Sequence, residues 1–77
     1  MSQKIPSGID WKREKCVFEH DGFVFKRGGS HWVGEKLGVL RPVIIPEYES
    51  IGPDITHRNM RTAGMSRARF LELLAKC

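Results

Sequence analysis

A pair of adjacent glycines, Gly28 and Gly29, constrains the fold of this chain more than any other feature of its sequence. The residues on either side, 23–27 and 30–35, are rich in the aromatic and β-branched side chains that strands favour. Glycine adopts the positive φ angles of tight turns at no steric cost. The sequence therefore predicts a β-hairpin that turns at the two glycines.

Side chains in these two strands alternate between the faces of the sheet. In the first strand, Phe23 and Phe25 share one face and Lys26 points to the other. In the second strand, His31 and Trp32 are neighbours and must point to opposite faces. We expect Trp32 to pack in the core. The alternative is that its ring stacks on a nucleic-acid base. We expect His31 to lie on the open face together with Lys26.

Capping signals predict a helix before the hairpin, over residues 8–21. Ser7 is a favourable N-cap, and Gly22 can adopt the left-handed conformation that ends a helix. His20 would lie at the end of this helix, where an imidazole suits the helix dipole, and we interpret it as structural.

After the hairpin, the sequence predicts a third strand over residues 39–45 and two closing helices. Pro42 lacks an amide proton, which favours an edge strand or a bulge there. The signals for the closing helices are a proline at a first helical position, a C-cap glycine and an N-cap serine: Pro53, Gly64 and Ser66. The predicted fold is a two-layer α+β sandwich in the order α-β-β-β-α-α, with a three-stranded antiparallel sheet and helices on one face.

Size and charge limit the functions that this chain can perform. Its 77 residues predict a single domain, 1–77, in which residues 1–6 are expected to be flexible. Any chemistry would then take place on a surface or in a shallow groove. Thirteen Lys and Arg against nine Asp and Glu leave a net charge of +4, which suits an anionic partner such as RNA. The first residues lack the apolar stretch of a signal peptide, so we expect a cytoplasmic protein without membrane contact.

The two cysteines, Cys16 and Cys77, lie far apart in the chain and show no metal-ligand spacing. A disulfide between them is possible by count, but nothing indicates a secreted disulfide framework. We expect Cys16 to pack in the first helix and Cys77 to be exposed. The sequence also lacks a carboxylate pair and a glycine-rich nucleotide loop, so no metal and no cofactor is expected.

Four short motifs follow one another along the chain: DGF at 21–23, GGSH at 28–31, VIIP at 43–46 and NMRTAGMSRARFLELL at 59–74. Together this ordered set resembles the HicA family of small toxins, the YcfA-like mRNA interferases. The resemblance extends over most of residues 7–74, and it implies the fold of a double-stranded-RNA-binding domain.

The resemblance also implies an activity and a partner. HicA-like proteins are metal-independent endoribonucleases of type II toxin–antitoxin systems that cleave mRNA. The histidine of their Gly-Ser-His step is catalytic, and here that position is His31. A HicB-like antitoxin protein, encoded beside the toxin, would cover the active face.

Physical chemistry supports a similar assignment for the residues around His31. Histidine titrates near neutral pH and can take a proton from a ribose 2′-hydroxyl or give one to the leaving oxygen. Backbone amides of a glycine turn can contact a phosphate, and neighbouring cations can offset its charge. The candidate catalytic residue is therefore His31, and the candidate RNA-binding residues are Lys26, Arg27, Gly28, Gly29 and Ser30.

Each of these residues also has an ordinary structural interpretation. A single histidine in a strand is often a half-exposed surface residue. Lys26 and Arg27 can be solvated charges that discourage edge pairing, and Ser30 either orients the imidazole or simply begins the strand.

Another basic stripe, formed by His57, Arg58 and Arg61, can face RNA, an antitoxin or only solvent. The acidic residues Glu47 and Glu49 lower the positive potential near the third strand. They favour an alternative function, a non-catalytic RNA-binding or partner-binding module of the same fold. A scaffold with no nucleic-acid role is the third possibility.

Overall fold

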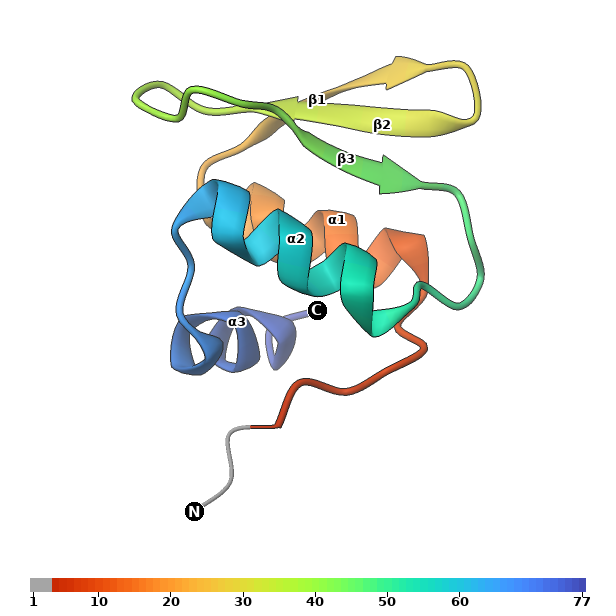
Figure 1. The fold of residues 1–77 in the computed structure, drawn as a ribbon, viewed down its shortest axis with the longest axis vertical. Helices are drawn as coiled ribbons and strands as arrows, with labels where there is room; N and C mark the ends of the chain where they lie inside the picture. Colours follow the sequence, from red (N-terminus) through yellow and green to blue (C-terminus); the bar gives the residue numbers. More distant parts are fainter. Residues whose placement is uncertain (1–3) are drawn as a thin grey trace.

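The computed structural model describes residues 4–77, which form a three-stranded antiparallel sheet with helices on one face (Figure 1). The elements in chain order are α1 (Trp11–His20), β1 (Val24–Gly28), β2 (His31–Glu35), β3 (Val43–Pro46), α2 (Pro53–Ala63) and α3 (Arg67–Leu74). The strand order is β1-β2-β3. Helices α1 and α2 lie against the sheet, and α3 packs on α1 at the side away from it (Figure 1). The predicted α+β class and the helix-covered face are confirmed.

The hairpin between β1 and β2 turns at the predicted glycines. Gly28 pairs with His31, so Gly29 and Ser30 are the two turn residues. Gly29 has a φ of 70°, the positive value that a two-residue turn with glycine at its first position requires. The same register pairs Trp32 with Ile45 of β3. Ile45 is fully buried, so this pair faces the helices and the intervening residue positions face outward.

Helix α1 begins at Trp11 rather than at residue 8, and the predicted N-cap Ser7 is wrong. Asp10 is the N-cap, and its carboxylate accepts a hydrogen bond from the backbone N–H of Arg13 at 2.9 Å. Ile9, just upstream, forms an isolated antiparallel bridge with Ile51, which holds the backbone there extended. Ile5 is also buried in the core. Of the segment 1–6 that we expected to be flexible, residues 1–3 lie outside the described residues.

Strand β3 begins at Val43, four residues later than predicted. Between β2 and β3 the chain turns at Gly38, which has a φ of 89°, and the Val39 N–H donates to the Lys36 carbonyl oxygen at 3.0 Å. Val39 still packs against the core, but from a turn. Pro42 lies outside the strand, so it causes no bulge within the ladder.

The aromatic centre of the core joins α1, α3 and Phe23, the residue directly before β1. Phe18 of α1 makes edge-to-face contacts with Phe23 at 5.8 Å and with Phe70 of α3 at 6.3 Å between ring centroids. The closing helices begin and end as predicted: Pro53 opens α2, Gly64 ends it in the left-handed conformation, and Ser66 caps α3.

A buried carboxylate ties α1 to α2. Glu14 is fully buried, and it accepts hydrogen bonds from the Thr56 hydroxyl and from the Asn59 side-chain amide. Asn59 also donates to the carbonyl oxygen of Ile44 at 2.9 Å, which extends the cluster to β3. Burial raises the pKa of Glu14 above its ordinary value, although the hydrogen bonds from Thr56 and Asn59 oppose this shift.

A disulfide links Cys16 of α1 to Cys77, which follows α3. The cysteine count allowed this pairing, although no secreted disulfide framework was expected. Cys77 is exposed and Cys16 is half-buried. No helix among residues 4–77 combines the length and apolar character needed to span a bilayer.

Candidate functional site

His31 lies at the first position of β2, directly after the hairpin turn. Its side chain is exposed on the open face of the sheet, the face without helices. Across the strands it pairs with Gly28 and with Pro46. A Cβ atom added at Gly28 would lie 3.8 Å from Nε2 of His31. The imidazole therefore lies over the backbone of Gly28, which has no side chain. Nothing among residues 4–77 hydrogen-bonds to the His31 side chain, which leaves both ring nitrogens available to a ligand.

Lys26 lies on the same open face as His31. It pairs with Val33, which makes Lys26 and His31 diagonal neighbours, about 7–8 Å apart in a regular antiparallel ladder. A lysine side chain is long enough to reach a phosphate held beside the imidazole. Val24, which is 70% exposed, and Ile44, 36% exposed, add an apolar centre to this face.

Arg27 lies on the opposite side of the sheet from His31, although it was predicted to bind the same phosphate as Lys26. Its guanidinium donates to Glu47 Oε1 at 3.0 Å. The other oxygen of Glu47 accepts a hydrogen bond from the indole N–H of Trp32 at 2.8 Å. Glu47 therefore neutralises Arg27 and fixes Trp32, a role that the sequence alone did not reveal.

The ring of Trp32 is enclosed by its own chain. It stacks on Trp11 with centroids 6.0 Å apart and planes inclined by 14°. The Lys15 ammonium lies 4.6 Å from the ring centroid, which is cation–π distance. The prediction that Trp32 packs inward is confirmed, since the half-buried ring lies against the core.

The hairpin turn presents open backbone beside His31. No atom lies within 4 Å of the position where a side chain at Gly29 would begin, and Ser30 is exposed. The Ser30 carbonyl oxygen accepts a hydrogen bond from the backbone N–H of Glu47 at 3.1 Å, which anchors the turn to the end of β3. Four of the predicted residues thus lie with His31 at one end of the sheet: Lys26, Gly28, Gly29 and Ser30.

A groove with three arginines lies between the β2–β3 loop and the end of α2. It has a volume of about 690 Å³, and Arg41, Arg58 and Arg61 line it. Within the described part of the chain, none of the three forms an ion pair. We name it the arginine groove. Arg41 was not singled out from the sequence, because only the fold brings this loop to α2.

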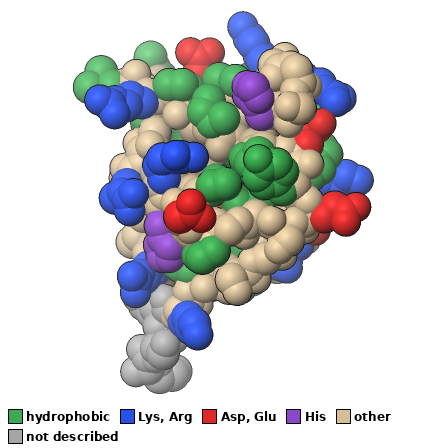
Figure 2. Space-filling model, turned by 45° about the vertical axis from the view of Figure 1, so that its right-hand side comes forward, with side chains coloured by type: hydrophobic (Ala, Val, Ile, Leu, Met, Phe, Trp, Pro, Cys, Tyr) green, Lys and Arg blue, Asp and Glu red, His purple; other side chains and the backbone are tan. Residues whose placement is uncertain are grey.

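His57 lines a different and smaller groove, together with Lys4 and Arg67. The stripe predicted on α2 therefore divides between two grooves. Figure 2 shows Lys and Arg side chains around the edges of this face of the molecule, on both sides, while hydrophobic side chains occupy more of its middle. His31 is at the beginning of β2, and the loop that lines the arginine groove begins after the other end of this strand. The length of β2 therefore separates His31 from the groove (Figure 1).

Comparison with known proteins gives no relative from which a function could be carried over. No protein-family model matches this chain, and neither does any curated protein or any solved structure. The functional assignment therefore depends on the fold and on the geometry of the open face. An exposed imidazole, a nearby ammonium and an unobstructed turn can together perform proton transfer on a bound anionic substrate.

Proposed function

We propose that this protein is a HicA-like mRNA interferase, an endoribonuclease that binds RNA on the open sheet face with His31 as general acid/base. The observation that supports this most is the position of His31. It ends the GGSH motif, is exposed on the open face, and is a diagonal neighbour of Lys26. The α-β-β-β-α-α order is also the one that the resemblance to HicA-like toxins implies.

The proposed reaction uses the RNA's own 2′-hydroxyl as the nucleophile. The 2′-oxygen forms a bond to the adjacent phosphorus, and the bond from phosphorus to the 5′-oxygen of the next nucleotide breaks. The products are a 2′,3′-cyclic phosphate and a 5′-hydroxyl. The neutral imidazole of His31 takes the 2′-hydroxyl proton, or the imidazolium gives a proton to the 5′-oxygen, and water completes the other transfer.

Lys26, Gly28 at the end of β1, and the turn residues Gly29 and Ser30 would bind the reacting phosphate. An ammonium and backbone amides that point at a phosphate stabilise the extra negative charge of the transition state. Arg27 instead keeps Glu47 and the turn in place. Phosphates elsewhere on the RNA would bind in the arginine groove, because unpaired guanidiniums suit phosphate oxygens.

The proposal includes a type II toxin–antitoxin context and a cytoplasmic location, where mRNA is translated. A HicB-like antitoxin would cover the open face. The exposed Val24 and Ile44 support this, since a protein partner would bury apolar side chains that RNA phosphates do not.

The test is cleavage of end-labelled RNA by the purified protein in the presence of a metal chelator. We expect fragments that end in a 2′,3′-cyclic phosphate, and loss of the fragments for His31→Ala. Equal cleavage by wild type and His31→Ala would exclude the catalytic assignment.

A second candidate function, a non-catalytic RNA-binding module, is favoured by Glu47, which neutralises Arg27 at 3.0 Å. Such a module would bind RNA with an affinity that falls steeply with salt concentration. It would give no fragments at any protein concentration, so the same gel distinguishes the two functions.

A further inference from the structure

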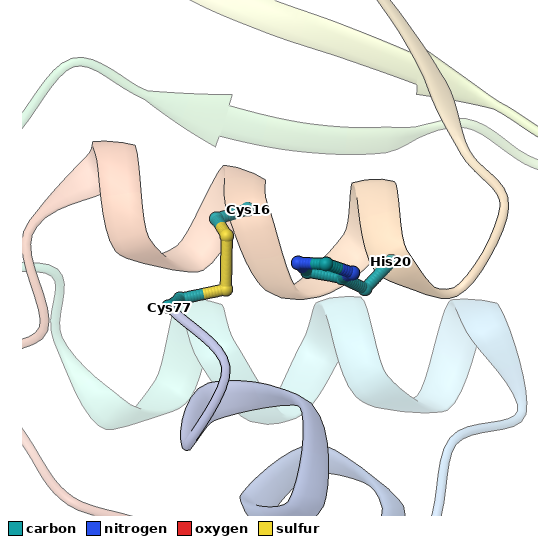
Figure 3. A group of neighbouring side chains, drawn as sticks. All are labelled: Cys16, His20 and Cys77. Carbon is teal, nitrogen blue, oxygen red and sulfur yellow. A yellow bond between two sulfur atoms is a disulfide. The ribbon is translucent and has the colours of Figure 1, made fainter.

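Cys16 and His20 lie on one face of α1, one helical turn apart. Residues four positions apart in a helix are surface neighbours. Cys77 reaches the same face from the chain that follows α3. The sulfur atoms of the two cysteines and a ring nitrogen of His20 all lie within 4.8 Å of one another. Figure 3 shows the imidazole beside the two sulfur atoms, which are joined as a disulfide.

Hydrogen bonds hold Cys77 near α1 independently of the disulfide. The Arg13 guanidinium donates to the carbonyl oxygen of Leu74 at 3.2 Å, which ties the end of α3 to α1. The backbone N–H of Cys77 donates to the same carbonyl group of Leu74 at 3.0 Å. When the disulfide is reduced, these contacts keep the two thiols close to each other and to His20.

Two thiols and an imidazole form a typical zinc ligand set. In a tetrahedral site with Zn–S bonds of about 2.3 Å, the two sulfur atoms lie about 3.7 Å apart. The Cα atoms of Cys16 and Cys77 are 6.1 Å apart, so rotation of the side chains can reach this separation. His20 and Cys77 are exposed and Cys16 is half-buried, which leaves a path for an ion from solvent.

We propose that the reduced protein binds one zinc ion through Cys16, His20 and Cys77, with the fourth position left to water or another ligand. A dithiol reductant supplies two electrons and two protons to the disulfide and is itself oxidised to a disulfide. Zinc then displaces the two thiol protons and is bound by two thiolates and a neutral imidazole. Oxidation of the thiolates by a disulfide oxidant re-forms the Cys16–Cys77 bond and releases the zinc.

The disulfide links α1 to the chain after α3 in the oxidised protein, and the zinc ion would link them in the reduced protein. Disulfides are rare in reducing compartments, where the thiols would persist. A metal that binds only the folded chain stabilises it. The site is on the helical side of the molecule, away from the open sheet face (Figure 1), so the inference does not depend on the proposed RNA cleavage.

The test uses the full chain, reduced and kept free of oxygen, with Co²⁺ as a spectroscopic probe and Zn²⁺ in competition with a chromophoric chelator. We expect one Co²⁺ per chain with sulfur-to-cobalt charge-transfer absorption, and displacement of Co²⁺ by Zn²⁺. The disulfide form should bind neither ion at this site. His20→Gln should weaken zinc binding at least about tenfold, the lower end of the loss seen for residues that only support a ligand. His57→Gln, a histidine outside the site, should bind as wild type.

Three results would overturn the inference. One is a reduced protein that is folded by circular dichroism but gives no thiolate–cobalt absorption. Another is unchanged zinc affinity in His20→Gln, and the third is a zinc-bridged dimer by size-exclusion chromatography. If Cys16→Ser or Cys77→Ser does not fold, the zinc-dependent rise in melting temperature decides: wild type should show it and folded His20→Gln should show much less.

Discussion

The buried carboxylate of Glu14 should make the stability of this protein depend on pH in a direction opposite to that of an ordinary ion-paired carboxylate. Glu14 is fully buried, with hydrogen bonds from Thr56 and Asn59 but no cation beside it among the described residues. Burial raises its pKa in the folded chain, while the unfolded chain keeps the ordinary value of 4.5. Below pH 4.5 the carboxyl group is protonated in both states and costs nothing.

As the pH rises above 4.5, the unfolded chain releases the Glu14 proton before the folded chain does. The contribution of Glu14 to the free energy of unfolding therefore falls until the pH exceeds the raised pKa, and this contribution is constant above it. The fall is about 1.4 kcal/mol for each pH unit by which the folded pKa exceeds the unfolded one.

Glu14→Gln should remove this pH dependence with little change in shape. The glutamine carbonyl can accept the bond from Asn59, and its NH₂ group can donate to the Thr56 hydroxyl, which rotates to accept. We expect the free energies of unfolding of wild type and variant to be closest at acid pH. As the pH rises to neutral, the free energy of unfolding of the variant should increase relative to that of wild type. Urea denaturation between pH 4 and pH 8, followed by fluorescence of Trp11 and Trp32, measures this difference.

The control for this experiment is Glu19→Gln, which removes an exposed carboxylate from the same helix. Its stability difference from wild type should vary much less with pH over the same range. The reasoning is refuted if the Glu14→Gln difference does not change with pH, or if the variant loses stability relative to wild type as the pH rises. The first result would mean that the hydrogen bonds to Glu14 balance the effect of its burial on the pKa, and the second that they outweigh it.

Three further predictions concern the sheet and its basic surfaces. Glu47→Gln should remove a negative charge near the hairpin turn and so tighten RNA binding at low salt, measured by fluorescence anisotropy, with a stability loss below about 1 kcal/mol because its ion-pair partner Arg27 is exposed; weaker binding would contradict it. Gly34→Ala should lower the free energy of unfolding by about 1–3 kcal/mol in urea, because the new methyl group would lie 2.5 Å from the Phe25 ring; an unchanged midpoint would contradict it. Arg58→Ala should reduce the salt slope of RNA binding by about 1, the loss of one phosphate contact; an unchanged slope would exclude Arg58 from the interface.

The hairpin could be predicted from the sequence because its causes are local. Alternation in residues 23–27 and 31–35 decides which side chain faces the core, and glycine at the turn allows the positive φ. These rules placed His31 outward and Trp32 inward. They could not show that Arg27 has a structural role rather than a role in RNA binding. Arg27 is held by Glu47, which lies twenty positions away in the chain.

The predictions that failed depend on contacts between distant segments. Ile9 looks like the start of a helical stripe, but its bridge to Ile51 keeps it extended. Val39 looks like strand, but it packs on the core from a turn. Nothing in the sequence marks Glu14 as buried, because only the fold brings Thr56 and Asn59 of α2 to it.

The candidate zinc site shows the same limit. Cys16 and His20 are four positions apart, a spacing that suits two ligands on one helix. The third ligand, Cys77, joins them only because α3 packs on α1, and that packing depends on Phe70 and Phe18 in the core. Sequence spacing alone therefore offers two of the three ligands, and the third comes only from the fold.

The single-turnover rate of RNA cleavage by wild type and by His31→Ala, with RNA affinity measured in parallel, tests the central claim most directly. We expect the variant to bind RNA about as tightly as wild type but to cleave it at least about 100-fold more slowly, the range for loss of a general acid/base. His57→Ala, the matched control, should cleave at the wild-type rate. Equal rates for wild type and His31→Ala would contradict the assignment of His31.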